Sequence, residues 1–544
     1  MVSNREWLAL LGYIALAGAF LLPSGPQLCH DLLGQHGGDN LESLWNAWWL
    51  SQSLWQLENP WWTDLVFAPT GTPLVWHSLA ILPSTAVALL ASFLPVSLAY
   101  NAVLAAALPI AGLGAFRLCR HLTSDAAASF AGGVAFMLCP FVVSKTLGHL
   151  DLAYAGLLPF FYLALLRCVS EPSRRSGWLA AASLLLLFAA SPNAAIFAAN
   201  LTFFLFCWYL RRESWASATR RFARAFAPTL LVALPYLALI FYYAIAYGDP
   251  PRTQRDLDYN PELISYLLPF TPTSLYSDWP QRLGLAGLDG IEPAVYLGVG
   301  VLPLAIAGLT LRRREALVPH LALVGAIFLV FSLGPKLLWQ REVVEVFGHS
   351  AYLPFGLWRW VPVLGAIGQA GRYGVIVYLV MAVGVAHAVA WGRLRYGRRW
   401  GLAAAGIAVA IVATDFAFRP TFSELPEPVQ LSPTAPDRHR VLDPRLGSSE
   451  TMYQQTLHGR PLVGGYISRP RRTLVEAYAH DPVLGWLFGV EPEPQPEVLI
   501  DRLRTLAVGD ILLDRGDPRA AALERAGFIA SPGSLETAVW SRPD

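Results

Sequence analysis

The sequence predicts an all-α polytopic membrane protein with a small α/β domain at its C-terminus. Of its 544 residues, 55% are hydrophobic and only 14% are charged, whereas soluble domains carry about 25% charged residues. Mean hydropathy is +0.43. The 19 tryptophans and 20 tyrosines are typical of chains whose aromatic rings lie at membrane interfaces. A net charge of +2 gives no reason to expect a nucleic-acid partner.

Apolar runs of roughly 17–20 residues are long enough to cross a bilayer as helices. The sequence offers about eleven such runs. They are 7–22, 98–116, 126–144, 151–168, 178–191, 194–210, 226–246, 294–311, 317–334, 373–391 and 401–418. The first is interpreted as an uncleaved span, because no small-x-small cleavage motif follows it.

Arginine sets the predicted orientation, since short cytoplasmic loops are enriched in it. The arginine-rich joints are 117–121, 170–177, 211–224, 312–315 and 392–399. With all of them inside, the N-terminus is cytoplasmic and the C-terminal tail is outside. The long apolar stretch 178–210 must then be a hairpin that turns at "SPN" (191–193). The segment 77–94 is left as an interfacial or re-entrant helix in the outer leaflet.

Two domains are expected. Residues 1–418 form the transmembrane domain, with a long first outer loop at 23–97 and a second outer loop at 247–293. A proline-rich linker then leads into an extracytoplasmic α/β domain within 419–544. In this tail, 510–514, 517–528 and 536–541 are predicted as strand, helix and strand, and capping of the outer face is favoured over catalysis.

The stretch "HGGDNLESLWNAWW" (36–49) begins a helix with one apolar stripe. Leu41, Leu44, Trp45, Trp48 and Trp49 recur at helical spacing, which is typical of a helix lying flat in the membrane interface.

Two roles are open for the acid that precedes this helix. With Glu42 three residues later, Asp39 fits a capping box. The two glycines before it and the positive helix start also suit an acid beside a phosphate-bearing substrate. We favour Asp39 as a general base, and its capping role is compatible with that.

Two outward segments carry candidate phosphate-binding groups. "SKTLGHLDL" (144–152) places Lys145, His149 and Asp151 between two spans, where ionisable side chains are costly and suggest function. "GAIGQAGRYG" (365–374) places Arg372 at the outer start of a span. A guanidinium matches phosphate oxyanions well, although snorkelling at the interface is the alternative for both segments.

Further side chains are expected to line the cavity or the acceptor entrance, which the helices 41–57 and 77–94 would shape. These are Glu42, Trp45, Asn46, His77, Asp151, Glu292 and His458. Neither the five cysteines nor the histidines show a metal-binding spacing, so neither a metal nor another cofactor is expected. The disfavoured alternative is a divalent metal held by His30, Asp31, His36 and Asp39.

Taken together, "GDNLESLWNAWW", "NPWWTDLVFAPTGTPLVWHS", "LGHLDL", "FSLGPKL", "GQAGRYG" and "QTLHGRPLVGGYISR" resemble the GT-C superfamily of membrane glycosyltransferases. Protein O-mannosyltransferases belong to it, and the resemblance is closer to uncharacterised bacterial YfhO-like proteins. It implies that the first-loop acid, here Asp39, is the general base and that the donor is a polyprenyl-phosphate sugar. Where O-mannosyltransferases have Asp-Glu, this chain has Asp39–Asn40. Only Asp151 stands where related oligosaccharyltransferases carry a metal-binding Asp motif.

The resulting hypothesis is an inverting glycosyltransferase of the bacterial inner membrane that works on its outer face. Its partners would be a lipid-linked sugar donor, membrane lipids, and a glycan, lipid or protein acceptor. Donor phosphate would be bound by Arg372, His149 and Lys145. The alternative is a non-catalytic lipid-linked-glycan transporter, assembly factor or scaffold, although the predicted spans contain almost no ionisable residues for a pump.

Overall fold

The computed structural model describes residues 4–35, 39–248, 260–269, 282, 294–361, 363–365, 367–431, 440–444, 448–534 and 537–541. The chain divides into two compact units. Unit 1 comprises 1–35, 97–234 and 253–423, and unit 2 comprises 36–96, 235–252 and 424–544. The predicted outer loop 247–293 lies outside the described residues except for 260–269 and Arg282.

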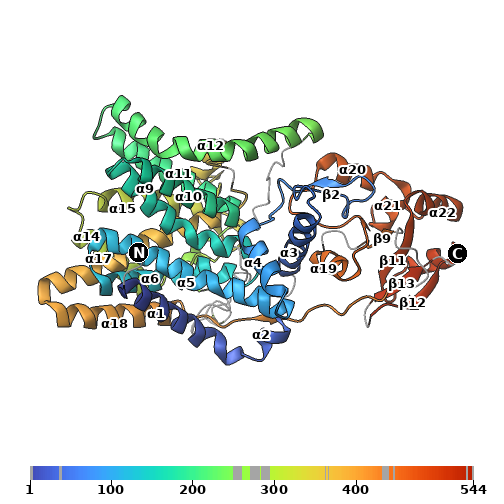
Figure 1. Ribbon diagram of the computed structural model, residues 1–544, viewed down its shortest axis with the longest axis horizontal. Coiled ribbons are helices and arrows are strands. Elements are labelled where there is room, and N and C mark those ends of the chain that lie inside the picture. Colours follow the sequence, from blue (N-terminus) through green and yellow to red (C-terminus); the bar gives the residue numbers. More distant parts are fainter. Residues whose placement is uncertain are drawn as a thin grey trace. The chain divides into compact units, whose positions relative to one another are not determined.

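Unit 1 is helical, and every apolar run predicted to span the membrane contains a helix (Figure 1). Its main helices are α1 (Asn4–Leu21), α5 (Val96–Thr123), α6 (Ala126–Met137), α7 (Pro140–Lys145), α8 (Leu150–Ala153), α9 (Leu158–Ser170), α10 (Arg174–Ala190), α11 (Pro192–Leu210), α12 (Trp215–Tyr247), α14 (Val301–Leu311), α15 (Val318–Ser332), α17 (Gly374–Tyr396) and α18 (Arg398–Asp415). The last residues of α12 belong to unit 2.

Four of the described helical segments are long and apolar enough to cross a membrane: Val96–Thr123, Leu150–Ser170, Pro192–Leu210 and Ala370–Tyr396. The chain is therefore a membrane protein, while the predicted number of spans stays a prediction. Two predicted spans are interrupted. The run 126–144 divides into α6 and α7, where Pro140 starts the second helix, and a 3-10 turn, η2 (Tyr154–Leu157), separates α8 from α9.

Local capping explains where several helices begin. The predicted hairpin turn at 191–193 is confirmed: α10 ends at Ala190, and the Ser191 hydroxyl accepts the Ala194 amide at the start of α11. Asp125 caps α6 in the same way, through the Ala128 amide. The α14 helix begins only at Val301, because the Asp415 carboxylate from α18 accepts the amides of Gly300 and Val301 at 2.7 and 2.9 Å.

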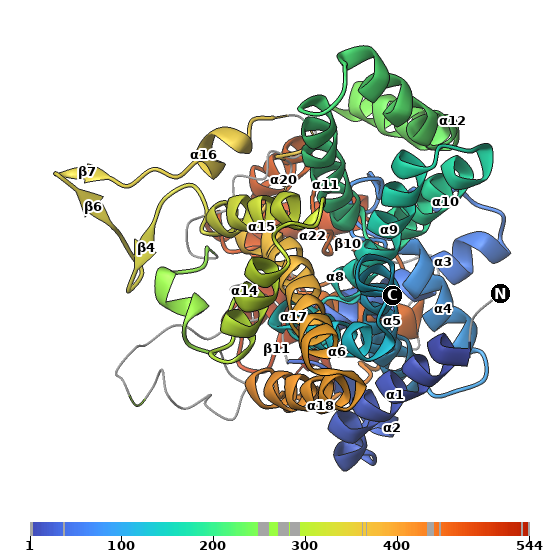
Figure 2. The same cartoon turned by 90° about the vertical axis from the view of Figure 1, so that its left-hand side faces the viewer.

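Helix α17 is the central helix of unit 1 and contacts α6, α14, α15 and α18 (Figure 2). Its crossing with α14 is very close. A Cβ placed on Gly384 would lie 2.5 Å from the Ala305 carbonyl oxygen, and one placed on Gly308 would overlap the Gly384 carbonyl. Glycine is required at this crossing because the two backbones touch.

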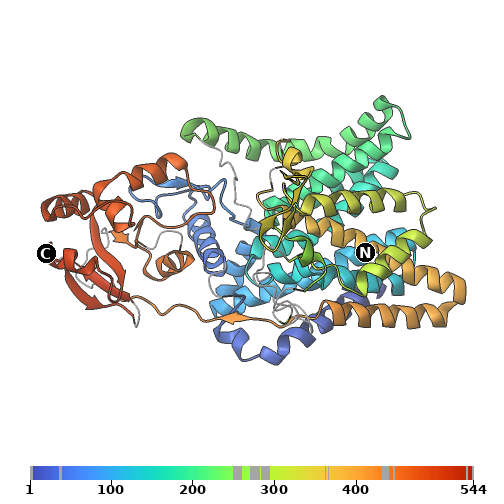
Figure 3. The same ribbon diagram turned by 180° about the vertical axis from the view of Figure 1, so that it is seen from behind.

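Unit 2 combines the predicted first outer loop with the tail (Figures 1 and 3). The loop contributes α3 (Asn40–Trp55), the hairpin of β2 (Trp62–Thr63) and β3 (Thr72–Pro73), and α4 (Ile81–Ala91). The tail helices are α19 (Ser449–His458), α20 (Arg472–Ala479), α21 (Pro482–Leu487), α22 (Pro496–Thr505) and α23 (Ala520–Arg525). At 11 residues, α4 is too short to cross a bilayer.

The tail contains a five-stranded mixed sheet in the order β10-β9-β11-β13-β12. The strands are β9 (Arg440–Leu442), β10 (Leu462–Val463), β11 (Val508–Asp514), β12 (Ile529–Pro532) and β13 (Thr537–Ser541). Strands β10, β9 and β11 run parallel, and β13 is antiparallel to both of its neighbours. The segments predicted as strand, helix and strand are thus β11, α23 and β13.

One hydrophobic core joins the loop and the tail inside unit 2. Trp45, Trp49 and Leu50 of α3 are buried together with Val441, Leu462 and Ile511 of the sheet, among others. This corrects the interfacial interpretation of α3, because its tryptophan stripe packs against protein rather than facing lipid. Only the C-terminal end of the helix is open, with Trp55 86% exposed.

Candidate functional site

Asp39 stands at the N-terminus of α3, but its carboxylate does not cap the helix. Its backbone has φ −74° and ψ 16°, and no cap hydrogen bond is made by the side chain. Its backbone carbonyl accepts the Ser43 amide, which is the first hydrogen bond within the helix, and the Ser43 hydroxyl, at 2.9 Å each. The predicted capping box is therefore wrong. The half-buried carboxylate is directed to contacts other than the first amides of its own helix.

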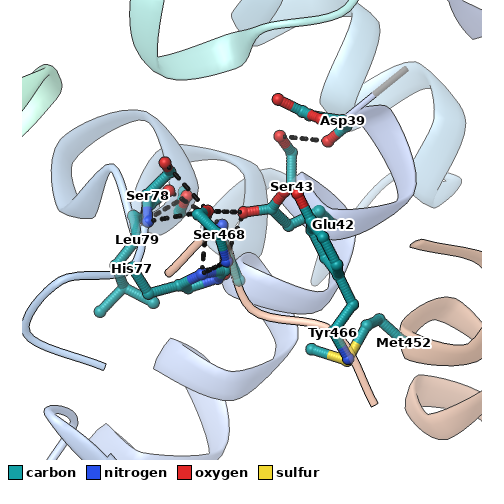
Figure 4. A network of polar contacts seen from close by, with 11 residues as sticks. Asp39, Glu42, Ser43, His77, Ser78, Leu79, Met452, Tyr466 and Ser468 are labelled. Atoms are coloured by element: carbon teal, nitrogen blue, oxygen red, sulfur yellow. Dashed lines mark hydrogen bonds and ion pairs between the residues drawn. The ribbon is translucent and has the colours of Figure 1, made fainter. Parts of the chain in front are cut away.

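Glu42, the other half of that predicted box, belongs to a buried polar network that Figure 4 shows from close by. The Ser468 hydroxyl from the tail donates to Glu42 Oε1 at 2.8 Å. The Nε2 atom of His77 lies 3.4 Å from the same oxygen. Because Glu42 is only 2% exposed, these partners offset the large cost of burying a carboxylate.

His77 is held as a neutral imidazole. Its Nδ1 accepts the Ser468 backbone amide at 3.1 Å, so this nitrogen carries no proton. Its Nε2 lies 2.8 Å from Asn46 Oδ1, and the Asn46 amide group donates to the Ser78 carbonyl. Nε2 therefore donates to Asn46. Burial lowers the pKa of His77 to about 3, and the negative charge of Asp39 opposes this only in part.

Trp45 lies beside this network, and His458 is on the helix that Trp45 contacts. The Trp45 ring is fully buried and meets His77 edge-on, with centroids 6.0 Å apart. Its indole donates to Gln455 Oε1 on α19 at 2.7 Å. His458 ends α19, and its Nδ1 accepts the Arg460 amide. Burial and the charge of Arg460 lower the pKa of His458 to about 4. These contacts favour a positioning role over direct contact with an acceptor.

In unit 1, the predicted 144–152 segment is a tight turn between α7 and α8. Lys145 is 1% exposed, with its ammonium 5.9 Å from the centre of the Phe141 ring. The Lys145 carbonyl accepts the His149 amide, and the His149 carbonyl accepts that of Ala153. Asp151 accepts the side-chain amide of Asn193, at the start of α11, at 3.3 Å. A buried ammonium is costly unless anionic or polar groups surround it.

Arg372 is half-buried in a 3-10 turn, η5 (Ala370–Tyr373), that runs directly into α17. The neighbouring ring of Tyr373 packs edge-on against Phe197 of α11, and Phe197 packs edge-on against Phe141 of α7. Two of the three phosphate-binding candidates, Lys145 and Arg372, are thus carried on segments that pack against one shared phenylalanine, Phe197.

The chain that leads to Asp39 is fixed to unit 1. The Asn101 side chain accepts the Leu33 amide at 2.7 Å and donates to two carbonyls, those of Leu28 and Asp31. The Gln35 amide then donates to the Leu147 carbonyl at 3.0 Å. Within unit 1, residues 32–35 therefore lie beside the turn that carries Lys145 and His149.

The structure brings Glu42, Asn46 and His77 together, and it places Lys145, His149 and Asp151 on one turn. Asp39 and Arg372 belong to different units. Glu292 lies outside the described residues. Sequence reasoning missed Ser468 and Asn193, which meet Glu42 and Asp151 across large sequence separations and match no local pattern. Within the described ranges, no three His, Cys, Asp or Glu side chains are placed to hold a metal.

Comparison with known proteins bears on the fold. Residues 31–417 match a family described as "Domain of unknown function (DUF6311)". No curated protein matches the chain in sequence. Among solved structures, it is similar to the arabinofuranosyltransferase AftD from Mycobacteria, with 14% identity and a TM-score of 0.58 over 100% of this chain and 40% of AftD. A mutant AftD structure gives 13% identity and a TM-score of 0.60, covering 100% and 42%.

The archaeal oligosaccharyltransferase AglB from Archaeoglobus fulgidus, solved with an inhibitory peptide and a dolichol-phosphate, has 12% identity and a TM-score of 0.47, covering 100% of this chain and 75% of AglB. The present chain spans about two fifths of the length of AftD. The similarity to AftD shows that the chain has a GT-C-like fold. The closer resemblance to YfhO-like proteins stays a prediction.

Proposed function

We propose that this chain, which belongs to the DUF6311 family, is a membrane glycosyltransferase in which Asp39 is the general base. The donor is a polyprenyl-phosphate sugar and the acceptor carries a hydroxyl group. The GT-C-like fold supports glycosyl transfer as the class of reaction. The observation that carries the assignment of the base is the geometry of Asp39, whose carboxylate makes no capping bond to α3.

The surroundings of Asp39 support this role in two ways. Its backbone is fixed by the two bonds from Ser43 to its carbonyl, so the carboxylate is carried on a rigid helix start. The nearby acid–base groups are also occupied. Glu42 is committed to Ser468 and His77, and the His77 Nδ1 lone pair is committed to the Ser468 amide. Glu42 and His77 are therefore poor candidates for the base.

In the proposed reaction, the Asp39 carboxylate takes the proton of the acceptor hydroxyl. The acceptor oxygen attacks the anomeric carbon and forms the new glycosidic bond with inversion. The bond from that carbon to the phosphate oxygen breaks, and polyprenyl phosphate leaves with the electron pair. Arg372, Lys145 and His149 are assigned to the phosphate, because cationic donors stabilise the charge that develops on its oxygens.

The test compares two aspartates that both precede helices. Transfer or hydrolysis is measured on the full chain in proteoliposomes with a panel of radiolabelled polyprenyl-phosphate monosaccharides. Asp39→Asn should lower the rate by about 10²–10⁴, the usual contribution of a general base, with the melting temperature unchanged. Asp125→Asn is the matched control, because Asp125 does cap its helix and pairs with Arg393; it should lower stability and leave the rate per folded molecule intact.

Two results would count against the proposal. Wild-type rates in Asp39→Asn would return this residue to a structural role. A wild-type chain that binds a donor but never cleaves it would favour the non-catalytic alternative, a transporter, assembly factor or scaffold for lipid-linked glycans.

A further inference from the structure

A pocket lies in unit 1, and none of its lining residues is assigned to sugar transfer. Its volume is about 490 Å³. It is lined by the last turn of α5, the last turn of α9 and the first turns of α10, including His121, Arg167, Glu171, Ser173 and Arg175. The lining thus carries two guanidiniums and a single carboxylate, which is a net positive charge. The volume is in the range of ligand-sized pockets.

The two arginines of this pocket have no partner within the described part of the chain. Neither the Arg167 nor the Arg175 guanidinium makes a hydrogen bond or ion pair there. Some arginines of other basic joints do have such partners: Arg117 pairs with Glu6, Arg221 with Glu213 and Arg393 with Asp125. The donors of Arg167 and Arg175 therefore remain available for a ligand.

The pocket lies at a membrane–water boundary. Two candidate spans, Val96–Thr123 and Leu150–Ser170, both have their C-terminal ends in its wall, through His121 and Ser170. An apolar span of about 20 residues fills the hydrocarbon thickness. The last turns of these two helices, and the pocket between them, are consequently at the depth of lipid headgroups. His121 belongs to the joint 117–121, and most of the other lining residues belong to the joint 170–177. The arginine distribution predicts that both joints are cytoplasmic.

The side chains of the pocket wall favour an oxyanion such as phosphate. Each guanidinium presents a fork of N–H donors that matches phosphate oxygens. The helix start of α10 supplies less, because the Ser173 and Ser176 side chains already satisfy it in a capping box. The arginine side chains, and not the backbone amides, must then hold the anion.

We propose that this pocket binds the phosphate of an anionic phospholipid headgroup. Arg167 and Arg175 hold the phosphate oxygens, and Glu171 limits the number of negative charges that the pocket accepts. A soluble phosphate offers the same oxyanions, so the test must separate the two sources. Basic pockets between transmembrane helices are suited to headgroups because each cation near the surface adds to binding.

The experiment uses the purified full chain in detergent, titrated in one arm with short-chain phosphatidylglycerol and in the other with inorganic phosphate, and read by native mass spectrometry and thermal shift. Loss of one arginine should weaken phosphatidylglycerol binding roughly 5-fold, and loss of both about 30-fold. The Arg167→Ala/Arg175→Ala double variant is compared with Arg398→Ala/Arg399→Ala, which removes an exposed arginine pair at the start of α18.

Glu171→Gln gives a second test with the opposite sign, because removing a negative charge from the wall should tighten phosphatidylglycerol binding. This keeps the proposal testable if the double alanine variant folds poorly. Binding of inorganic phosphate that equals the binding of phosphatidylglycerol, with the same dependence on Arg167 and Arg175, overturns the headgroup assignment in favour of a soluble phosphate. If Arg167→Ala/Arg175→Ala and the control Arg398→Ala/Arg399→Ala weaken phosphatidylglycerol binding equally, the proposed site is refuted.

Discussion

His77 makes unit 2 sensitive to acid. In the fold its pKa is about 3, because burial disfavours the imidazolium, whereas an unfolded histidine titrates near 6.5. Between these values the unfolded chain binds a proton that the folded chain does not. Stability therefore falls as pH is lowered through 6.5, and the loss levels off only near pH 3.

The size of the effect follows from the two pKa values. From pH 7 to pH 5 the unfolded state gains about 2 kcal/mol from protonating this one residue, at about 1.4 kcal/mol for each pH unit below 6.5. The contacts agree with this direction. A proton on Nδ1 would oppose the Ser468 amide that now donates to it at 3.1 Å, and His77 as a whole is only 4% exposed. In a unit of roughly 200 residues this corresponds to a fall of about 4–8 °C in melting temperature.

The assay is tryptophan fluorescence during thermal unfolding of the full chain in detergent, since Trp45 and Trp49 report on the core of unit 2. Other histidines also titrate, so the informative quantity is the difference between wild type and His77→Gln. The variant is less stable at pH 7 and should lose about 2 kcal/mol less than wild type on going to pH 5. Equal slopes for both proteins would show that His77 is not buried as a neutral imidazole.

Two other substitutions test the packing. Ser468→Ala removes the hydroxyl that donates to Glu42. It should lower the free energy of unfolding by about 1–3 kcal/mol, because a buried carboxylate loses a donor. In a double-mutant cycle with Glu42→Gln the two effects should be non-additive, and additivity would exclude the contact. Gly384→Ala should destabilise unit 1 by about 1–3 kcal/mol, since its Cβ would meet the Ala305 carbonyl oxygen at 2.5 Å. Gly406→Ala, on the open side of α18, should instead be neutral or stabilising in the same melting experiment.

The positions of the helices were predictable because they depend on local chemistry. Apolar runs near the length of a bilayer become helices, and the turn at Ser191 follows from a serine cap and a proline at the first helical position. The same local rules failed at Asp39 and Glu42. Their spacing fits a capping box, but Ser468 and His77 offer the Glu42 carboxylate stronger partners, and the Asp39 backbone takes a conformation that its side chain cannot cap from.

Long-range packing determined the features that local rules did not predict. An apolar stripe records that a helix face is buried, but not whether lipid or protein covers it, because both are equally apolar. The sequence by itself therefore determined the membrane class and the positions of the helices. Only the tertiary structure decided that Trp45 and Trp49 pack in a core shared with the tail, and that Glu42 meets Ser468 across 426 residues. Such pairs have no signature in either segment alone, since each exists only once the loop and the tail have folded together.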